Sequence, residues 1–433
     1  MKMALMIPAA ILAVTVCAAE ARVVTLEQAI AVAMEKNRTI EKAREYARYV
    51  QGKYVEERAA ALPQVSLNGS VTVSKDESLK VTGYSAQRQF GQALDLTISQ
   101  PIYTWGKLTA AIRAAEVGLK TADEQLRLYR QATYREVVAA FHDIQLAKEV
   151  HRLAQENRAQ KLRHLDEATR KFSAGVATDY DVLAAEVAAE NTLPDVIRSE
   201  NGIRLAREQL RFFLATGEEE IDAAGSLDVS AMDRPLPAGY AEAVSIAGKR
   251  RPELADLRLR IAIYDELVTI ANADNKPRLD LKGGAGWRRI GLDSPGPALN
   301  GDGAAWDLGL YMTFPFFDGL RTSGKVAQAE SELRTKQIEE RRLLDTIALE
   351  VRQAEFSCRE AAEILKALSG TVKQAERLVQ MAEKGYEFGV KIRLEVDDAQ
   401  YNLLQAKSTK ARVQRDLRVA EVNYLWAMGV VGE

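Results

Sequence analysis

Apolar and polar residues alternate one by one in four short stretches of the chain. In the first stretch, Val65, Leu67, Val71 and Val73 are separated by serine, asparagine, glycine and threonine. A repeat of two residues is typical of a β-strand with one apolar and one polar face. The alternation predicts strands at about residues 64–74, 92–101, 277–290 and 304–317.

Two much longer stretches, 104–172 and 319–386, contain no proline and are rich in Ala, Leu, Glu, Arg, Lys and Gln. These residues lose little conformational freedom on entering a helix. At 1.5 Å per residue, each stretch would form a helix roughly 100 Å long, far beyond the usual helix of about 11–12 residues. The pattern therefore predicts a coiled coil, a repeat or an elongated tube.

The chain is internally duplicated. Four landmark residues each recur 214 positions later, namely Pro63 as Pro277, Pro101 as Pro315, Glu116 as Glu330, and Gly175 as Gly389. Landmarks at one spacing across most of the chain indicate two copies of one structural unit. Each copy is expected to contain a helix, two strands, a long helix, a glycine-containing turn and a shorter helix.

Repeat 1 is expected over residues 22–217. Besides its strands, its predicted elements are a helix of ~35 residues from Leu26 to about Ala61, the long helix 104–172, a turn at 173–178 and a helix at 178–214. Pro194 has no counterpart in repeat 2 and predicts a break in the last of these helices near residues 192–194.

Repeat 2 is expected over residues 240–433. Its predicted helical elements are a helix from Tyr240 to about Asn275, the long helix 319–386, a turn at 387–392 and a helix at 392–428. Residues 218–239, with Pro235 and Pro237, are interpreted as a partly irregular linker between the repeats.

Residues 1–21 have the pattern of an export signal peptide. Lys2 precedes an apolar run, and Ala19-Glu20-Ala21 has the small residues of a cleavage site. A transmembrane anchor would need about 20 apolar residues. Lipidation of Cys17 is the other alternative, although Val16 stands where a small residue is preferred. Cleavage would leave Cys358 as the only thiol and exclude an internal disulfide.

Composition argues against several classes of function. The formal net charge is −2, and basic and acidic residues are interspersed, which disfavours nucleic-acid binding. His142, His151 and His164 place no pair on one helix face, so no metal site is expected and these side chains should be solvated or interfacial. No catalytic constellation or phosphate loop is recognisable, and neither an enzyme nor a cofactor is predicted.

The strands allow two interpretations. They could form hairpins with one face on a core, or they could cross a membrane with the apolar face toward lipid. The polar residues suit a water-filled lumen, and Trp287, Trp306, Phe314, Phe316 and Phe317 could lie at the interfaces. Four strands cannot close a barrel, because about eight is the smallest number that does. Membrane-spanning strands would therefore require several chains to share one barrel.

The order of elements, repeated twice, resembles that of the TolC-type outer-membrane efflux protein family. The resemblance includes Leu-Pro-Gln-Val at 62–65, Pro-Ile-Tyr-Thr-Trp-Gly at 101–106 and Pro-Phe-Phe-Asp-Gly at 315–319. It implies a mainly α fold with a small β part: a duplicated long-helix α-barrel tunnel, with four strands per chain in a shared twelve-stranded transmembrane β-barrel. A homotrimer in the outer membrane of a Gram-negative bacterium, with a long periplasmic extension, is implied as well.

The function implied by the resemblance is that of a passive exit duct in a tripartite efflux or secretion system. Its partners would be outer-membrane lipid, a periplasmic adaptor, and an inner-membrane transporter of the RND, ABC or MFS type. The tip turns, with Gly175, Val176, Gly389 and Val390, would dock the adaptor. The alternative is a soluble periplasmic coiled-coil scaffold. The sequence does not identify the cargo.

The resemblance also assigns residues to a narrow periplasmic entrance. Glu395 and Asp398 match acidic rings, with glutamate as a longer variant of the usual aspartate. Asp181, Tyr386 and Lys391 match the ionic and hydrogen-bond links that hold the entrance shut. Acidic residues are favoured in a helix's first turn, which accounts for Asp181. We expect Glu395 and Asp398, which share one helix face, to have a role beyond that.

Overall fold

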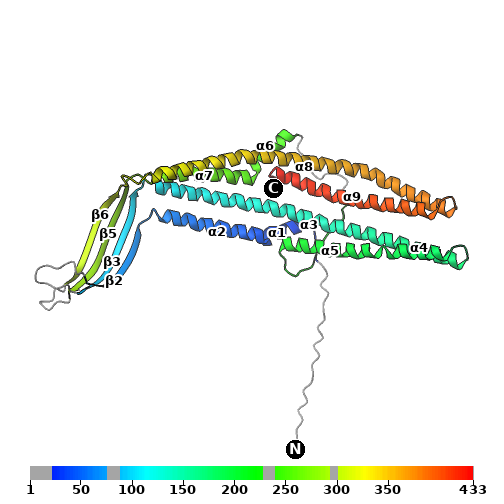
Figure 1. The fold of residues 1–433 in the computed structure, drawn as a ribbon, viewed down its shortest axis with the longest axis horizontal. Coiled ribbons are helices and arrows are strands. Elements are labelled where there is room, and N and C mark those ends of the chain that lie inside the picture. Colours follow the sequence, from blue (N-terminus) through cyan, green and yellow to red (C-terminus); the bar gives the residue numbers. More distant parts are fainter. Residues whose placement is uncertain (1–21, 76–87, 228–238, 293–300, 433) are drawn as a thin grey trace, which may run out of the picture. The chain divides into compact units, whose positions relative to one another are not determined.

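The computed structural model describes residues 22–75, 88–227, 239–292 and 301–432 (Figure 1). The predicted signal peptide, with Cys17, lies outside the described residues. The helical elements of repeat 1 are α1 (Leu26–Lys36), α2 (Arg38–Ala59), α3 (Lys107–Ser173), α4 (Asp179–Glu190) and α5 (Leu193–Leu214). Those of repeat 2 are α6 (Tyr240–Arg250), α7 (Pro252–Asn272), α8 (Arg321–Glu387) and α9 (Arg393–Ala427). None of the helices in this described part has an apolar stretch suited to crossing a membrane.

The prediction of one continuous first helix in each repeat is wrong. Asn37 separates α1 from α2 and is buried; its Oδ1 accepts from the Thr39 N–H at 2.8 Å, and its Nδ2 donates to the Phe213 carbonyl at 2.8 Å. Arg251, 214 positions later, separates α6 from α7 and is also buried. It forms an ion pair with Glu350, in which Nη2 lies 2.8 Å from Oε2. Pro252 at the start of α7 is the sequence signal that indicates this second break.

The predicted break in the last helix of repeat 1 is confirmed. Helix α4 ends at Glu190 and α5 begins at Leu193, with Pro194 in the first turn of α5. Proline is tolerated there because the first N–H groups of a helix have no partner within the helix. Thr192 is buried between the two helices, and its hydroxyl donates to the Ala189 carbonyl at 2.6 Å.

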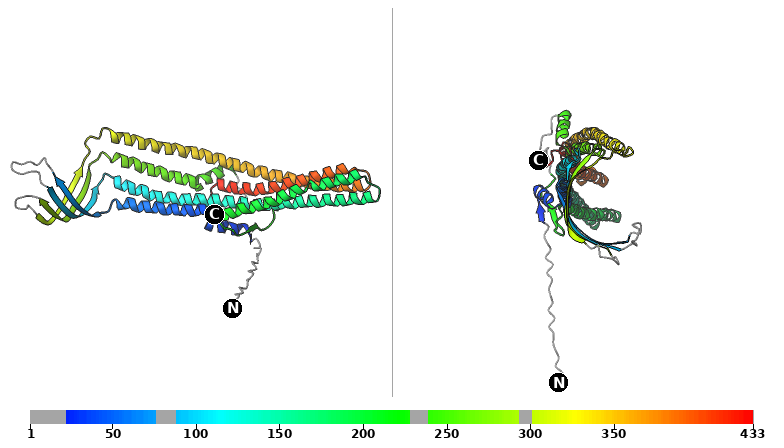
Figure 2. Two further views of the ribbon diagram at one scale, coloured as in Figure 1. Left: turned by 60° about the horizontal axis from the view of Figure 1, so that its bottom comes forward. Right: turned by 90° about the vertical axis from the view of Figure 1, so that its left-hand side faces the viewer.

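Four antiparallel strands form one curved sheet in the order β2–β3–β5–β6 (Figures 1 and 2). Their bounds are β2 Gln64–Lys75, β3 Arg88–Tyr103, β5 Arg278–Leu292 and β6 Gly301–Thr313. The register places Leu67 opposite Leu96, Leu96 opposite Ala285, and Ala285 opposite Trp306. Paired residues of adjacent strands lie on the same face. The alternation predicted from the sequence is therefore confirmed, with the apolar positions of all four strands on one face.

Side chains on this apolar face are exposed in the single chain. Leu67 is 66% exposed, Trp306 81% and Leu308 67%. The other face carries polar residues, including Asp95, which stands opposite Gly286. A Cβ at Gly286 would lie 2.2 Å from the Asp95 carboxylate, so glycine is needed for this side chain to lie across the strand. In this position, Asp95 Oδ1 lies 3.4 Å from Arg288 Nε on the neighbouring strand.

The chain divides into two compact units. Unit 1 comprises residues 1–40, 130–240 and 352–433, and unit 2 comprises residues 41–129 and 241–351. Unit 1 contains a parallel strand pair that the sequence did not reveal, β1 (Arg22–Val24) with β4 (Ile221–Ala223). It packs with α1, α3 and α5 around buried Val137 and Leu210. The four-stranded sheet belongs to unit 2.

Candidate functional site

The turns that follow the two long helices have the same backbone structure. Gly175 and Gly389 have φ of +74° and +70°, a conformation that glycine adopts without a steric penalty. The Val176 N–H donates to the Lys171 carbonyl at 3.0 Å, and the Val390 N–H donates to the Gly385 carbonyl at 2.8 Å. Hydrogen bonds that reach back five residues in this way satisfy carbonyls at the end of a helix. Both turns therefore end their helix by the same mechanism.

Apolar side chains project from these turns into solvent. Val176 is 74% exposed, Val390 82% and Phe388 78%. Exposed large apolar residues that are grouped together are typical of surfaces that contact another protein. The turns that were predicted to dock an adaptor thus present apolar side chains in the single chain.

The helices after the turns begin with equivalent acidic residues. Asp181 is the third residue of α4, and its carboxylate accepts from the Thr178 N–H at 2.8 Å and from the Thr178 hydroxyl at 2.7 Å. Glu395, the third residue of α9, accepts from the Ile392 N–H at 3.1 Å. Each carboxylate thus binds an N–H group that the helix itself leaves unpaired. Glu395 therefore caps its helix as Asp181 does, a contact that the sequence analysis predicted only for Asp181.

Lys391 lies beside Glu395 within the chain. Its Nζ is 2.6 Å from Glu395 Oε1. Its stem lies against Gly385, where an added Cβ would be only 2.9 Å from Lys391 Cγ and Cδ. Hydrogen bonds from Lys391 and the Ile392 N–H lower the pKa of Glu395. Among the described residues of one chain, Lys391 and Asp181 are not brought together.

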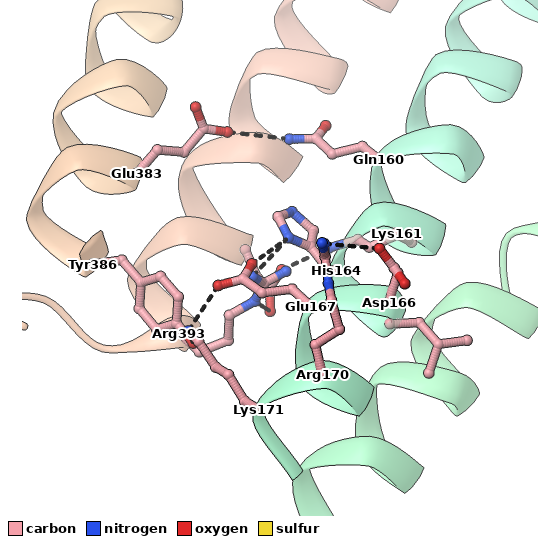
Figure 3. A network of polar contacts seen from close by, with 12 residues as sticks. Gln160, Lys161, His164, Asp166, Glu167, Arg170, Lys171, Glu383, Tyr386 and Arg393 are labelled. Carbon is pink, nitrogen blue, oxygen red and sulfur yellow. Dashed lines mark hydrogen bonds and ion pairs between the residues drawn. The ribbon is translucent and has the colours of Figure 1, made fainter. Parts of the chain in front are cut away.

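Tyr386 is fixed by groups from three helices. Its ring packs against the buried cluster of Val379, Ala382, Val396 and Ala399, which joins α8 to α9. Lys171 of α3 places its Nζ 4.7 Å from the ring centroid and 3.4 Å from the hydroxyl oxygen (Figure 3). Tyr386 therefore connects the end of α3 to the α8–α9 pair inside one chain.

Glu395 and Asp398 lie on the outer side of the first turns of α9. Both are exposed, whereas Val396 and Ala399, which alternate with them along the helix, are buried. The two carboxylates thus share a solvent-facing side of α9, as their spacing predicts. No ion pair joins Asp398 to another described residue.

A polar network behind this face was not found by sequence reasoning (Figure 3). Lys161 of α3 binds Asp397 of α9 at 2.7 Å. Arg393 binds Asp397 at 3.4 Å and donates from Nη1 to His164 Nδ1 at 2.8 Å. The Gln400 side-chain nitrogen lies 3.2 Å from His164 Nε2 and donates to Glu383 of α8 at 3.2 Å. The network therefore links α3, α8 and α9 through buried and half-buried groups.

His164 is held neutral by this environment. Burial, with the positive charges of Arg393 and Lys161, lowers its pKa to about 4. Burial alone would raise the pKa of Asp397, but Lys161 and Arg393 outweigh that effect and lower it. Of the two expected placements of His164, solvated or interfacial, the second holds: its side chain is 17% exposed and lies between α3 and α9. No periodic pattern marks these residues, because the network depends on the packing of helices distant in the sequence.

Within the described residues, no group of histidine, cysteine, aspartate or glutamate side chains could hold a metal ion. The site consists of helix ends, exposed apolar turns and carboxylates. Such an arrangement is suited to contacting a protein and attracting cations.

Comparison with known proteins places the chain in a family. A family model described as "Outer membrane efflux protein" matches residues 29–216 and 243–430, one match for each repeat. The outer membrane protein TolC of Vibrio cholerae is 22% identical over 87% of this chain and 84% of its own length. The outer membrane efflux protein BepC of Brucella suis is 22% identical over 94% of this chain and 85% of its own length. The alkaline protease secretion protein AprF of Pseudomonas aeruginosa is 24% identical over 78% of this chain and 69% of its own length.

A solved structure has the same fold. The Campylobacter jejuni CmeC outer membrane channel superposes with a TM-score of 0.83 at 16% identity, covering 94% of this chain and 85% of that one. The predicted fold class is confirmed: the protein is mainly helical and duplicated, with a small β part of four strands. The chain therefore belongs to the outer membrane efflux protein family, and it is an outer membrane channel rather than a periplasmic scaffold.

Proposed function

We propose that three copies of this chain form a passive exit duct, with no catalytic step of their own. The observation that carries the proposal is the four-stranded sheet, with an exposed apolar face and a polar opposite face. An unclosed sheet edge in lipid would leave backbone groups unpaired at several kcal/mol each. Three chains would supply twelve strands, an even number within the range of known outer-membrane barrels.

The tip of α3, α4, α8 and α9 would form the periplasmic entrance of the duct. Three-fold symmetry would place three copies of Glu395 and three of Asp398 around one axis. Their charges would attract cations to a narrow opening. Lys391, Tyr386 and Asp181 would then link neighbouring chains. In forming such a link, Lys391 would exchange its contact with Glu395 for one with Asp181.

The partners would be a periplasmic adaptor and an inner-membrane transporter of the RND, ABC or MFS type. Exposed Val176 and Val390 at the turns would contact the adaptor. The chain would reach the outer membrane by export, after cleavage of residues 1–21. The relatives include proteins named for efflux and for protease secretion, so either class of cargo fits this proposal.

Mass measurement of the detergent-extracted protein tests this proposal. We expect extraction from outer membranes only with detergent, followed by a monodisperse particle of three chains. Circular dichroism on the same sample would report the strands. A monodisperse monomer with the full strand signal would contradict the shared twelve-stranded barrel, and release by salt alone would contradict membrane insertion.

A further inference from the structure

A cavity of about 620 Å³ lies in unit 2, where the four-stranded sheet meets the ends of the helices. Its charged lining is unbalanced: four cationic side chains, Lys107, Lys276, Arg278 and Lys282, face two carboxylates, Asp274 and Asp280. A cavity of this size is in the range that binds small molecules. We propose that this cavity is a binding site for a small amphipathic organic anion.

The two carboxylates are already neutralised by neighbours. Lys107 Nζ lies 2.5 Å from Asp274 Oδ1, and Lys325 Nζ lies 2.5 Å from Asp274 Oδ2. Asp280 is buried and binds Arg278 at 2.8 Å. Asp274 therefore shares one negative charge between two ammonium groups, so excess positive charge remains beside the cavity.

The other two cations are available to a ligand. Lys276 and Lys282 are both exposed, and neither has a carboxylate partner among the described residues. The Lys282 ammonium instead lies 5.6 Å from the Tyr311 ring centroid. An incoming carboxylate could pair with either ammonium group without displacing an existing ion pair.

The strand residues that line the cavity all lie on the polar face of the sheet. Ser99 stands opposite both Gln64 and Lys282, Pro101 opposite Asp280, and Arg278 opposite Thr313. The apolar face, with Leu279 and Leu281, contributes nothing to the lining. The cavity therefore opens away from the face that would meet lipid, which favours a soluble anion over a lipid headgroup.

Apolar groups complete the cavity wall. Pro101, Leu108 and Pro315 lie among the lining residues, together with the hydroxyl-bearing Thr104. An apolar body could lie against these groups while its acidic group meets the lysines. This combination of apolar contact area with a few placed polar groups is typical of small-molecule sites.

The test is equilibrium binding of 4-fluorobenzoate to the full-length protein in an uncharged detergent. Binding is measured by the broadening of the ¹⁹F line of the ligand. We expect saturable binding that weakens with added salt, and no saturable binding of 4-fluorobenzylamine, a cation of similar shape. Lys276→Gln with Lys282→Gln should weaken binding on the order of five- to tenfold. Lys42→Gln removes an exposed lysine elsewhere in unit 2 and should leave binding unchanged.

A charge-retaining variant makes the result specific. Lys276→Arg with Lys282→Arg should keep the affinity within about twofold, because the positive charge remains. Equal broadening of the anion and the cation would overturn the proposal, as would unchanged affinity in the glutamine variant. Binding in detergent requires no conduction. A negative binding result would therefore not contradict the exit duct. Absence of conduction, in turn, would not contradict this binding site.

Discussion

Asp181 and Glu395, 214 residues apart, make the same contact in the two repeats. Each carboxylate accepts the N–H of the residue three positions earlier, Thr178 at 2.8 Å and Ile392 at 3.1 Å. The duplication thus preserved a helix start as well as a sequence landmark. Glu395 differs by also binding Lys391, whereas Asp181 receives the hydroxyl of Thr178. The two residues therefore have one structural role and two electrostatic surroundings.

Removal of either carboxylate should loosen the start of its helix. In Asp181→Ala, we expect amide exchange in residues 178–183 to become on the order of fivefold faster, because the cap hydrogen bonds are lost. Glu395→Ala should have the same effect on residues 392–397. Asp398→Ala is the matched control, because that carboxylate caps no helix. Similar acceleration in the control would show that charge, and not capping, sets the local stability.

The network around His164 should make the tip less stable as pH falls. The native pKa is about 4, below the ordinary value of 6.5, so the unfolded chain binds more protons between these values. The stabilisation is present above pH 6.5 and is lost as pH falls toward 4. The facing charges are Lys161, Glu167, Arg393 and Asp397. A hydrogen bond from Lys171 lowers the pKa of Glu167, and Lys161 with Arg393 lowers the pKa of Asp397, so both carboxylates stay ionised while His164 begins to titrate.

Amide exchange of residues 160–168 as a function of pH checks this prediction. The loss of protection between pH 6.5 and 4 should be smaller in His164→Gln, which keeps a polar side chain without the titration. His151→Gln is a suitable control, because that histidine contacts Ser199 outside the network. Identical pH profiles for the wild type and His164→Gln would contradict the assignment of this dependence to His164.

The two faces of β6 should respond differently to a charge. Leu308→Arg should destabilise the assembled barrel by roughly 2–4 kcal/mol if the site lies near the bilayer midplane. Thr313→Arg, on the polar face of the same strand, should leave assembly intact and change conduction. Heat resistance of the oligomer in detergent distinguishes the two variants, because only Leu308→Arg should lower it. Equal loss of assembly in both variants would mean that the lipid and lumen faces are assigned wrongly.

The features that could be predicted from the sequence are those that depend on the period of apolar residues and on the spacing of the two repeats. Alternation located the strand faces, and the 214-residue offset located Gly175 and Gly389 at equivalent turns. The same offset applied to Asp181 would have found Glu395 as its structural equivalent. No proline marks the break at Asn37, whose side chain caps α2 through the Thr39 N–H and also binds the distant Phe213 carbonyl. The His164 network was missed because its partners come from three separate helices.

Acidic residues at the entrance should make the channel sensitive to multivalent cations. Six carboxylates around one axis would concentrate such ions, and Glu395→Gln with Asp398→Asn should abolish their block of the current. Glutamine at position 395 keeps the cap acceptor, so the helix start should survive. Block by cobalt hexammine in planar bilayers measures the effect. Unchanged block in this variant would exclude these carboxylates as the binding ring.

The links at the entrance should be weak enough to release. Exposed ion pairs contribute little, so Lys391→Ala with Tyr386→Phe should open the entrance without loss of the oligomer. We expect a higher single-channel conductance than in the wild type. Lys373→Ala, an exposed lysine elsewhere on α8, is the control and should leave conductance unchanged. Equal conductance in the double variant and the wild type would remove these residues from the closing links.

The most direct test of the exit duct is single-channel recording of the purified wild-type protein in planar bilayers. We expect discrete, uniform current steps that are cation-selective and small, because the duct would be closed at its periplasmic end. Reversal potentials in a salt gradient would give the selectivity on the same channels. Absence of discrete steps, both in the wild type and in Lys391→Ala with Tyr386→Phe, would contradict the assignment of this protein as an exit duct.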